Sequence, residues 1–308
     1  MFNPGVLFFP VTPFDRSGQV SLHTLAQHVE DGMVHRPAGV FAACGTGEVH
    51  ALSATEHAEV TRCVATTVNG RIPVFAGAGG PLPTAVAMCR TAAEHGADGV
   101  LLLPPYLVGA PQPGLVHYIT QIAAASPIPV VVYSRGNAVL NETAAVQIAR
   151  LGNVVGFKDG VGDVELMHRI VLAVREAGVE DFTFFNGLPT AELTVPAYRG
   201  IGVDRYSSAV FAFAPEIATA FWQSLYTGDG IVARDLLARV YLPFARLRDE
   251  VPGYAVALVK AAVTQRGLDV GGVRAPLTDP TPEHRDRLRE LLAAGLDLVN
   301  AHGAGALA

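Results

Sequence analysis

The chain of 308 residues is poor in lysine, in charge and in long apolar segments. Of its 22 lysines and arginines only Lys158 and Lys260 are lysines, and the net charge of -6 provides no basic field for nucleic acid. No stretch reaches the roughly 18 consecutive apolar residues of a membrane helix. Half of the residues are nevertheless hydrophobic, so the chain can bury a sizeable core. The sequence predicts a globular protein that binds neither nucleic acid nor membrane.

Cysteine is scarce too, and the three examples are Cys44, Cys63 and Cys89. An odd number without zinc-type spacing indicates reduced thiols in a cytoplasmic protein. The first residues, MFNPGVLFFPVTPFD, lack the basic start and the long apolar core of a signal peptide, which favours the same location. No grouping of histidine, cysteine and aspartate has the spacing of metal ligands, so we expect no metal.

Short apolar runs recur along the first 210 residues and start 22 to 34 residues apart. Runs that are apolar throughout, rather than alternating, are typical of parallel strands buried on both faces. Segments with helical periodicity separate them, and Ser53 followed by Glu56 predicts a capping box at the start of one such helix. The predicted strands lie in 5–14, 39–48, 72–80, 99–107, 128–136, 154–160, 181–188 and 203–210.

Eight strand–helix units in about 210 residues predict a (β/α)8 TIM barrel, an α/β fold. An open doubly wound sheet is the alternative, but it usually has fewer strands and a glycine-rich phosphate loop after the first strand. The first run ends instead in TPFDRSG (12–18), which contains no such loop. After Val210 the strand pattern gives way to helical segments. We therefore expect a catalytic barrel over 1–225 and a C-terminal helical extension over 226–308.

The active site of such a barrel lies at the carboxyl ends of its strands, so the residues that end each apolar run are the candidates. The polar residues and glycines at these positions are Gly45, Thr46, Gly47, Glu48, Tyr106, Tyr133, Ser134, Arg135, Lys158, Asp159, Asn186, Gly187, Tyr206, Ser207 and Ser208.

Lys158 ends the apolar run VVGFK (154–158), where burial disfavours a charged ammonium. A neutral amine there can attack a ketone and form an imine, which withdraws electrons from the neighbouring carbon. The alternative is an ion pair with Asp159, although consecutive strand residues point to opposite faces. The chain otherwise uses arginine as its cation, and arginine cannot form imines. Lys260, in a helical segment, is expected to pair or to reach solvent, without a catalytic role.

Tyr133, on the neighbouring predicted strand, is a candidate to move protons for the imine. The alternative is a tyrosine at the edge of the core whose hydroxyl is satisfied by a hydrogen bond. The turn Gly45-Thr46-Gly47 can present backbone N–H groups to a carboxylate, with the Thr46 hydroxyl near Tyr133 as a third member of the catalytic set. Glu48 is expected to hold this turn in place.

Several motifs together resemble the class I aldolase-like family of dihydrodipicolinate synthase and N-acetylneuraminate lyase. The likeness covers nearly the whole chain and rests on VTPFD (11–15), GTGE (45–48), LLLPPYL (101–107), Tyr133 and GFKDG (156–160). The resemblance implies that Lys158 forms the Schiff base and that Tyr133 is the acid/base. It implies further that Gly45 and Thr46 bind the carboxylate of an α-keto acid, and that the chain assembles as a homotetramer.

Within this family the chain departs from the dihydrodipicolinate synthases. Gly45 replaces the first of their two turn threonines, and Leu107 replaces their second tyrosine after the fourth strand. The chain is more similar to the branch of 5-dehydro-4-deoxyglucarate dehydratases, through NGLPTAEL (186–193), YSSAVFAF (206–213) and GGVRAPLTD (271–279). The residues that differ from this branch, and so affect the expected shape of the pocket, are Cys44, Ser134 and Ala212.

This resemblance implies that the protein dehydrates and decarboxylates 5-dehydro-4-deoxyglucarate, a sugar diacid, to 2,5-dioxopentanoate. The imine with Lys158 would suffice for both steps, without a metal or another cofactor. The second carboxylate of the diacid needs its own partners, and the candidates are Arg135, Ser207 and Ser208, with Gly187 lining the same site. The alternatives are an ion pair of Arg135 with Asp159 or Glu48 and ordinary hydrogen bonds of the two serines at the barrel rim.

Two other functions would use the same residues. A retro-aldol lyase, or a synthase of the dihydrodipicolinate synthase type, would act on a pyruvate-type 2-keto acid through the same lysine and tyrosine. The lyase would release pyruvate instead of carbon dioxide. A non-catalytic sensor of sugar acids would form no covalent adduct at Lys158.

Overall fold

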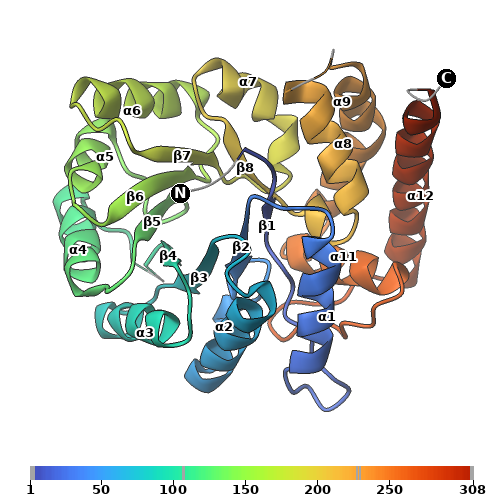
Figure 1. Ribbon diagram of the computed structural model, residues 1–308, viewed down its shortest axis with the longest axis horizontal. Helices are drawn as coiled ribbons and strands as arrows, with labels where there is room; N and C mark the ends of the chain where they lie inside the picture. The colour runs from blue at the N-terminus through green and yellow to red at the C-terminus, as the bar shows by residue number, and fades with distance from the viewer. Residues whose placement is uncertain (1–3, 106–107, 227, 229, 306–308) are drawn as a thin grey trace.

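The computed structural model describes residues 4–105, 108–226, 228 and 230–305. Over these residues eight parallel strands form a closed barrel in chain order (Figure 1). The first strand pairs with the last, through Leu7 beside Ser207, as well as with the second. The TIM barrel prediction is therefore confirmed, and the open sheet is wrong because such a sheet would leave two free edges.

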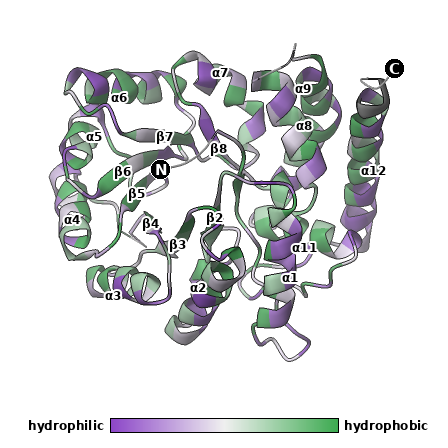
Figure 2. Cartoon of the chain, viewed as in Figure 1, coloured by the Kyte–Doolittle hydropathy of each residue, from purple (hydrophilic) through white to green (hydrophobic). Residues whose placement is uncertain are grey.

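Each strand lies inside one of the predicted apolar runs. The strands are β1 (Leu7–Phe8), β2 (Gly39–Ala42), β3 (Val74–Ala78), β4 (Gly99–Leu102), β5 (Val130–Ser134), β6 (Val154–Asp159), β7 (Thr183–Asn186) and β8 (Arg205–Ser208). Most of their residues are buried whichever way they point, because apolar side chains fill the inside of the barrel and helices cover its outside. Figure 2 shows that the strands are largely hydrophobic.

The helices of the barrel follow the periodic segments between the strands. They are α1 (Leu22–Met33), α2 (Ala54–Val68), α3 (Leu82–Glu94), α4 (Gln112–Ala125), α5 (Glu142–Ala149), α6 (Val164–Glu176), α7 (Val195–Gly200) and α8 (Pro215–Tyr226), with the short turns η1 (Val49–Ala51), η2 (Ala191–Leu193) and η3 (Val210–Ala212). The predicted capping box opens α2. The Glu56 N–H donates to Ser53 Oγ at 3.2 Å, and the Ser53 N–H donates to Glu56 Oε2 at 2.9 Å.

The C-terminal extension consists of α9 (Ile231–Leu236), the π-helical turn η4 (Leu237–Tyr241), α10 (Leu242–Asp249), α11 (Tyr254–Gln265) and α12 (Pro282–Gly305). The sequence pattern predicts a helix over 230–251, and the structure inserts the π turn into it. Pro243 lies just after this turn, has no N–H to donate and crowds the carbonyl one turn before it. The wider turn accommodates that interruption.

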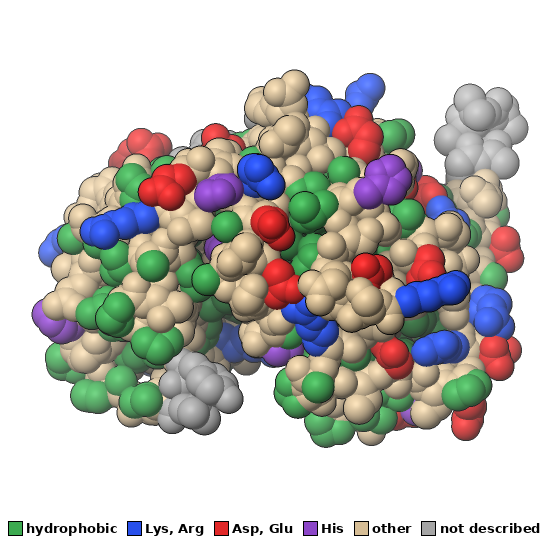
Figure 3. All heavy atoms as spheres, turned by 90° about the horizontal axis from the view of Figure 1, so that it is seen from below, with side chains coloured by type: hydrophobic (Ala, Val, Ile, Leu, Met, Phe, Trp, Pro, Cys, Tyr) green, Lys and Arg blue, Asp and Glu red, His purple; other side chains and the backbone are tan. Residues whose placement is uncertain are grey.

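Apolar side chains form three buried clusters. One fills the inside of the barrel and includes the stacked rings of Phe9, Phe41 and Phe75. A second lies between the middle strands and their helices. The third joins α1, α2 and α8 to the extension, so the extension packs onto the barrel through a shared core. The boundary at residue 225 stays a prediction. On the face seen in Figure 3, acidic and basic side chains are interspersed rather than gathered by sign.

Glu48 and Lys260 form an ion pair that is almost completely buried, with Lys260 Nζ 2.9 Å from Glu48 Oε1. Lys260 also donates to the Gly272 carbonyl at 2.5 Å, and the Arg274 backbone N–H donates to Glu48 Oε2 at 2.9 Å. Burial lowers the pKa of Lys260, and the charge of Glu48 offsets part of this effect. The pair ties the turn after β2 to α11, as expected for both residues.

Glu192 is a second fully buried carboxyl group, in η2 after β7. Its Oε1 accepts from Ser208 Oγ at 2.5 Å, and its Oε2 has no hydrogen-bond partner in the described chain. Burial raises the pKa of Glu192 to about 7, although Ser208 and the charge of Arg248 oppose this rise. The buried hydroxyls of Tyr206 and Tyr241 lie close enough to feel its charge. Glu192 is therefore protonated below neutral pH.

We predict that Lys260→Met destabilises the protein by about 3–5 kcal/mol, because it leaves the Glu48 carboxylate buried without its cation. The double variant with Glu48→Gln should recover part of this loss, since no buried charge remains. The free energy of unfolding in urea measures both effects. The control is Arg289→Ala, which breaks an exposed pair with Asp286 and should cost less than about 1 kcal/mol. A Lys260→Met cost no larger than the control contradicts the prediction.

We predict that Glu192→Gln stabilises the protein relative to wild type above neutral pH. The folded state keeps the proton of Glu192 up to about pH 7, whereas the unfolded state releases it near 4.5. Wild type therefore loses about 3 kcal/mol through this group as pH rises across that interval, and the glutamine variant does not. Urea unfolding at pH 5 and pH 8 gives the difference. Glu94→Gln, at an exposed position, is the control, and a difference independent of pH refutes the expectation.

Candidate active site

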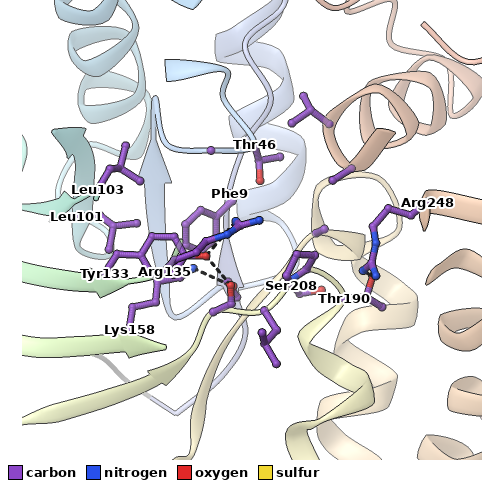
Figure 4. Close-up of a pocket in the computed structure, with 18 of the residues that line it drawn as sticks. Phe9, Thr46, Leu101, Leu103, Tyr133, Arg135, Lys158, Thr190, Ser208 and Arg248 are labelled. Carbon is purple, nitrogen blue, oxygen red and sulfur yellow. Dashed lines mark hydrogen bonds between the residues drawn. The ribbon is translucent and has the colours of Figure 1, made fainter. Parts of the chain in front are cut away.

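The carboxyl ends of the strands enclose a cavity of about 290 Å³, shown in Figure 4. Eight of the strand-end candidates line it, and they include every residue to which the sequence assigns a catalytic or substrate-binding role. These residues are Gly45, Thr46, Tyr133, Arg135, Lys158, Gly187, Ser207 and Ser208. Apolar side chains of the barrel interior, among them Phe9 and Leu101, form part of the lining near Lys158.

Lys158 ends β6 with only 5% of its surface exposed. Tyr133 on β5 is its direct neighbour in the strand register. The Nζ atom of Lys158 lies 3.8 Å from the centroid of the Tyr133 ring and 5.4 Å from that of Phe9. It donates a hydrogen bond to the Gly187 carbonyl at 3.3 Å. The amine is thus enclosed by two rings and a peptide carbonyl at the bottom of the cavity.

In the described chain Lys158 has no carboxylate partner. Asp159, the expected alternative partner, accepts instead from the Tyr198 hydroxyl and from the N–H groups of Val161 (3.0 Å) and Gly162 (3.3 Å). Asp159 therefore holds the backbone after β6. Lys158 is thus not held in an ion pair, as a lysine that acts as a nucleophile requires.

The Tyr133 hydroxyl donates to the Gly187 carbonyl at 2.8 Å and accepts from Arg135 Nη1 at 3.3 Å. Burial alone would raise the pKa of Tyr133, but the positive charges of Lys158 and Arg135 outweigh it and lower the pKa below its ordinary value. A tyrosine so placed can give up and take back a proton beside the amine. Its hydroxyl also has hydrogen-bond partners, as expected from the alternative in which Tyr133 is a tyrosine at the edge of the core.

Two glycines make this close arrangement possible. A Cβ atom at Gly187 would lie 2.5 Å from Lys158 Nζ, and one at Gly160 would lie 2.7 Å from the Tyr133 ring. Real side chains do not approach so closely, so any larger residue would displace the lysine or the tyrosine. Gly187 contributes its carbonyl to both groups and therefore sets their common orientation.

The turn after β2 forms another part of the wall. The backbone N–H groups of Gly45 and Thr46 have no acceptor in the described part of the chain, and both residues line the cavity. The Thr12 hydroxyl donates to the Gly47 carbonyl at 2.7 Å and helps to fix the turn. In Figure 4 Thr46 lies across Phe9 from Lys158. The two free N–H groups can receive a carboxylate there.

The wall opposite Lys158 carries Ser208, Thr190 and Arg248, and Ser207 also lines the cavity. The Ser208 hydroxyl is engaged by Glu192, whereas Ser207 has no side-chain hydrogen bond in the described chain. The alternative for Arg135 was an ion pair with Asp159 or Glu48, and it forms neither among the described residues. Its guanidinium donates instead to the Tyr133 hydroxyl. Arg135 and Ser207 thus remain free for a ligand.

No residue of the wall formed by the extension was among the predicted site residues. Its residues in the lining are Phe244, Arg248, Gly253, Ala255, Val256 and Leu277, and His50 and Thr190 were missed as well. Two motifs that are similar to the dehydratase branch could have pointed to this wall, namely GYAVALVKA (253–261) and GGVRAPLTD (271–279), which contains Leu277. Arg248 lies in an ordinary charged segment and carries no such signal.

The residues that depart from the dehydratase branch lie outside the described lining of the cavity. Cys44 is buried, and its thiol donates to the Ala42 carbonyl. The Ser134 hydroxyl accepts from the Leu140 N–H at 3.1 Å, and Ala212 is buried in η3. The expected positions Tyr106 and Leu107 lie outside the described residues.

Two features are absent from the described residues. No three side chains of histidine, cysteine, aspartate or glutamate come together as metal ligands would. No helix there is both long and apolar enough to cross a membrane.

Comparisons with known proteins agree with this geometry. A model of the "Dihydrodipicolinate synthetase family" matches residues 3–295. The chain is 51% identical to "Probable 5-dehydro-4-deoxyglucarate dehydratase 1" of Streptomyces coelicolor, over 98% of its own length and 95% of that protein. It is 40% identical to the 5-dehydro-4-deoxyglucarate dehydratase of Pseudomonas putida, over 95% of each chain.

Among solved structures, the dihydrodipicolinate synthase of Oceanobacillus iheyensis has a TM-score of 0.87 at 27% identity, over 94% of this chain and 96% of that one. The expected family resemblance is confirmed over nearly the full length. This chain therefore belongs to the dihydrodipicolinate synthetase family.

Proposed function

We propose that the protein dehydrates and decarboxylates 5-dehydro-4-deoxyglucarate, giving 2,5-dioxopentanoate, carbon dioxide and water. One observation carries the proposal: an enclosed lysine without a counter-ion lies against Tyr133, in a chain similar over nearly its whole length to dehydratases of that name. The substrate is a six-carbon diacid with a ketone at C5, next to the C6 carboxylate.

The reaction begins when the Lys158 amine adds to the C5 ketone. Loss of water leaves a protonated imine, and the positive nitrogen acidifies the protons on C4. One of these protons leaves, and the electron pair of the C4–H bond expels the hydroxyl group of C3. That group takes up a proton and departs as water, so a C3=C4 double bond is now conjugated with the imine.

The conjugated imine then accepts a second electron pair. The bond between C1 and C2 breaks, C1 leaves as carbon dioxide, and its bonding electrons move through C3 and C4 to the nitrogen. Protonation at C4 regenerates the imine, and the C2 enol becomes the aldehyde as its hydroxyl proton is exchanged for one on C3. Hydrolysis of the imine then releases the five-carbon product and restores the Lys158 amine. One lysine serves both steps, because each uses the same nitrogen as the electron acceptor.

Tyr133 is the group proposed to move protons in these steps. Its hydroxyl lies beside the amine, shares the Gly187 carbonyl with it and has a lowered pKa. A lowered pKa makes the tyrosine a better base towards C4 at neutral pH than an ordinary phenol. Arg135 supports this role through its contact with the hydroxyl. Thr46 stays proposed as a third member of the catalytic set, from its place in the lining.

The carboxylate next to the ketone is proposed to bind at the free N–H groups of Gly45 and Thr46. Arg135, Ser207 and Ser208 line the cavity and stay proposed for the second carboxylate, with Ser208 the least available because its hydroxyl bonds Glu192. The homotetramer and the cytoplasmic location also stay predictions, the first from the family resemblance and the second from the sequence.

We predict that purified protein releases carbon dioxide from 5-dehydro-4-deoxyglucarate and that Lys158→Arg and Lys158→Ala do not. The arginine variant is the sharper one, because it keeps a cation at the bottom of the cavity but cannot form an imine. Borohydride with pyruvate should add mass to wild type alone. Carbon dioxide is measured by a coupled assay and the adduct by mass spectrometry.

The outcomes separate the three functions. If wild type forms an imine with pyruvate but is inert with the diacid, the chain is a retro-aldol lyase or a synthase rather than a dehydratase. If borohydride traps nothing with either compound, the enclosed lysine is not a nucleophile and a sensor is the better description. Release of carbon dioxide by Lys158→Arg contradicts the imine mechanism.

A further inference from the structure

We propose that Arg248, supplied by the C-terminal extension, binds the C1 carboxylate of the substrate in addition to the residues proposed above and thereby selects diacids over monoacids. The inference rests on the proposed function and assigns to the same site a residue that sequence patterns did not single out. It also gives the extension a part in substrate recognition.

Arg248 lies in the last turn of α10 and lines the cavity. Its side chain is 16% exposed, so the guanidinium is largely removed from water. In Figure 4 Arg248 and Thr190 stand on the opposite side of the cavity from Lys158 and Tyr133. A substrate joined to Lys158 through C5, with C6 at the turn after β2, has its remaining carbons free to extend towards this wall.

The guanidinium has donors to spare. Of its five N–H groups, Nη1 donates one to Thr190 Oγ1 at 2.7 Å, and Nε and Nη2 donate one each to Asp249 at 2.8 and 3.0 Å. In the described chain this leaves one N–H on each terminal nitrogen without an acceptor. A free N–H on each terminal nitrogen allows the guanidinium to donate to a carboxylate.

The backbone conformation of Thr190 supports the proposed role of Arg248. Thr190 has φ 53° and ψ 57°, the left-handed conformation that a β-branched residue rarely adopts. Glycine would adopt that conformation without strain, but it has no hydroxyl to hold Arg248 Nη1. Strain that is retained at a cavity wall commonly serves to position a functional group. Here the group positioned is the guanidinium.

The charges around Arg248 leave it able to attract an anion. Its partner Asp249 is 65% exposed and therefore well screened by solvent. The nearby buried carboxyl of Glu192 is protonated below neutral pH. Arg135, the other arginine of the cavity, is exposed at the mouth and bonds to Tyr133. Arg248 is the less hydrated of the two, so a carboxylate gains more by binding it.

The test uses two 2-keto acids that differ only at the far end. 2-Oxoadipate has the six-carbon diacid skeleton with the ketone in the same place, and 2-oxohexanoate has a methyl group instead of the distal carboxylate. Each is titrated while borohydride traps its imine at Lys158, and mass spectrometry gives the half-saturating concentration. This readout depends on imine formation and does not require the dehydratase reaction.

We expect wild type to prefer 2-oxoadipate and Arg248→Gln to lose the preference. The half-saturating concentration of 2-oxoadipate should rise by about 10- to 100-fold, the loss expected for a charged hydrogen-bonded pair. That of 2-oxohexanoate should stay within about twofold of wild type, since it makes no use of the guanidinium. Arg246→Gln, at an exposed position of the same helix, should leave both values unchanged.

Two variants of Thr190 test the positioning. Thr190→Val keeps the branched shape without the hydroxyl and should weaken 2-oxoadipate selectively, whereas Thr190→Ser should restore most of the preference. For carbon dioxide release from the diacid, Arg248→Gln should raise KM with little change in kcat, because the contact is already made in the bound ground state.

The inference is overturned if wild type does not distinguish the two acids, or if Arg248→Gln keeps the preference. It is also overturned if the variant loses both acids equally, because that result marks a purely structural arginine. Failure of the proposed function looks different. Wild type would then release no carbon dioxide from 5-dehydro-4-deoxyglucarate, while the preference for 2-oxoadipate and its dependence on Arg248 would persist.

Discussion

The buried ion pair between Glu48 and Lys260 is the interaction on which the mouth of the barrel depends. It joins the turn after β2, with the free N–H groups of Gly45 and Thr46, to α11 of the extension. The second oxygen of Glu48 holds the backbone at Arg274, so one carboxylate fixes segments far apart in the sequence. This buried contact holds the extension against the mouth of the barrel. Residues of the extension, including Arg248, therefore line the candidate active site.

The two lysines of the chain have opposite surroundings. Lys260 is surrounded by a carboxylate, a carbonyl and an aromatic ring, which together keep it a structural cation. Lys158 has rings and a carbonyl but no carboxylate in the described chain. The same residue type therefore serves stability in one place and, in the proposed function, chemistry in the other. The surroundings of Lys158 also include the Tyr133 hydroxyl, a proton donor, and the Gly187 carbonyl that accepts from it.

Much of the fold could be predicted. The apolar runs that mark the strands are local features of the sequence, and the topology of a parallel barrel requires that the carboxyl ends of all strands meet at one end. This requirement alone brought Lys158, Tyr133 and the turn at Gly45 to one cavity. The extension could not be placed in this way, because no strand pairing fixes the position of helices that follow the last strand. Arg248 was therefore missed. The engagement of Ser208 by Glu192 was also invisible, because it depends on which way a rim hydroxyl turns within a packed wall.

The most direct measurement of the central claim follows the carbons through the covalent intermediate. The protein is incubated with 5-dehydro-4-deoxyglucarate labelled with carbon-13 at C1, reduced with borohydride and mapped by peptide mass spectrometry. The account predicts a five-carbon adduct on Lys158 without the label, and the label in carbon dioxide. An adduct on another residue, or a six-carbon adduct at Lys158 with no labelled carbon dioxide, would contradict it.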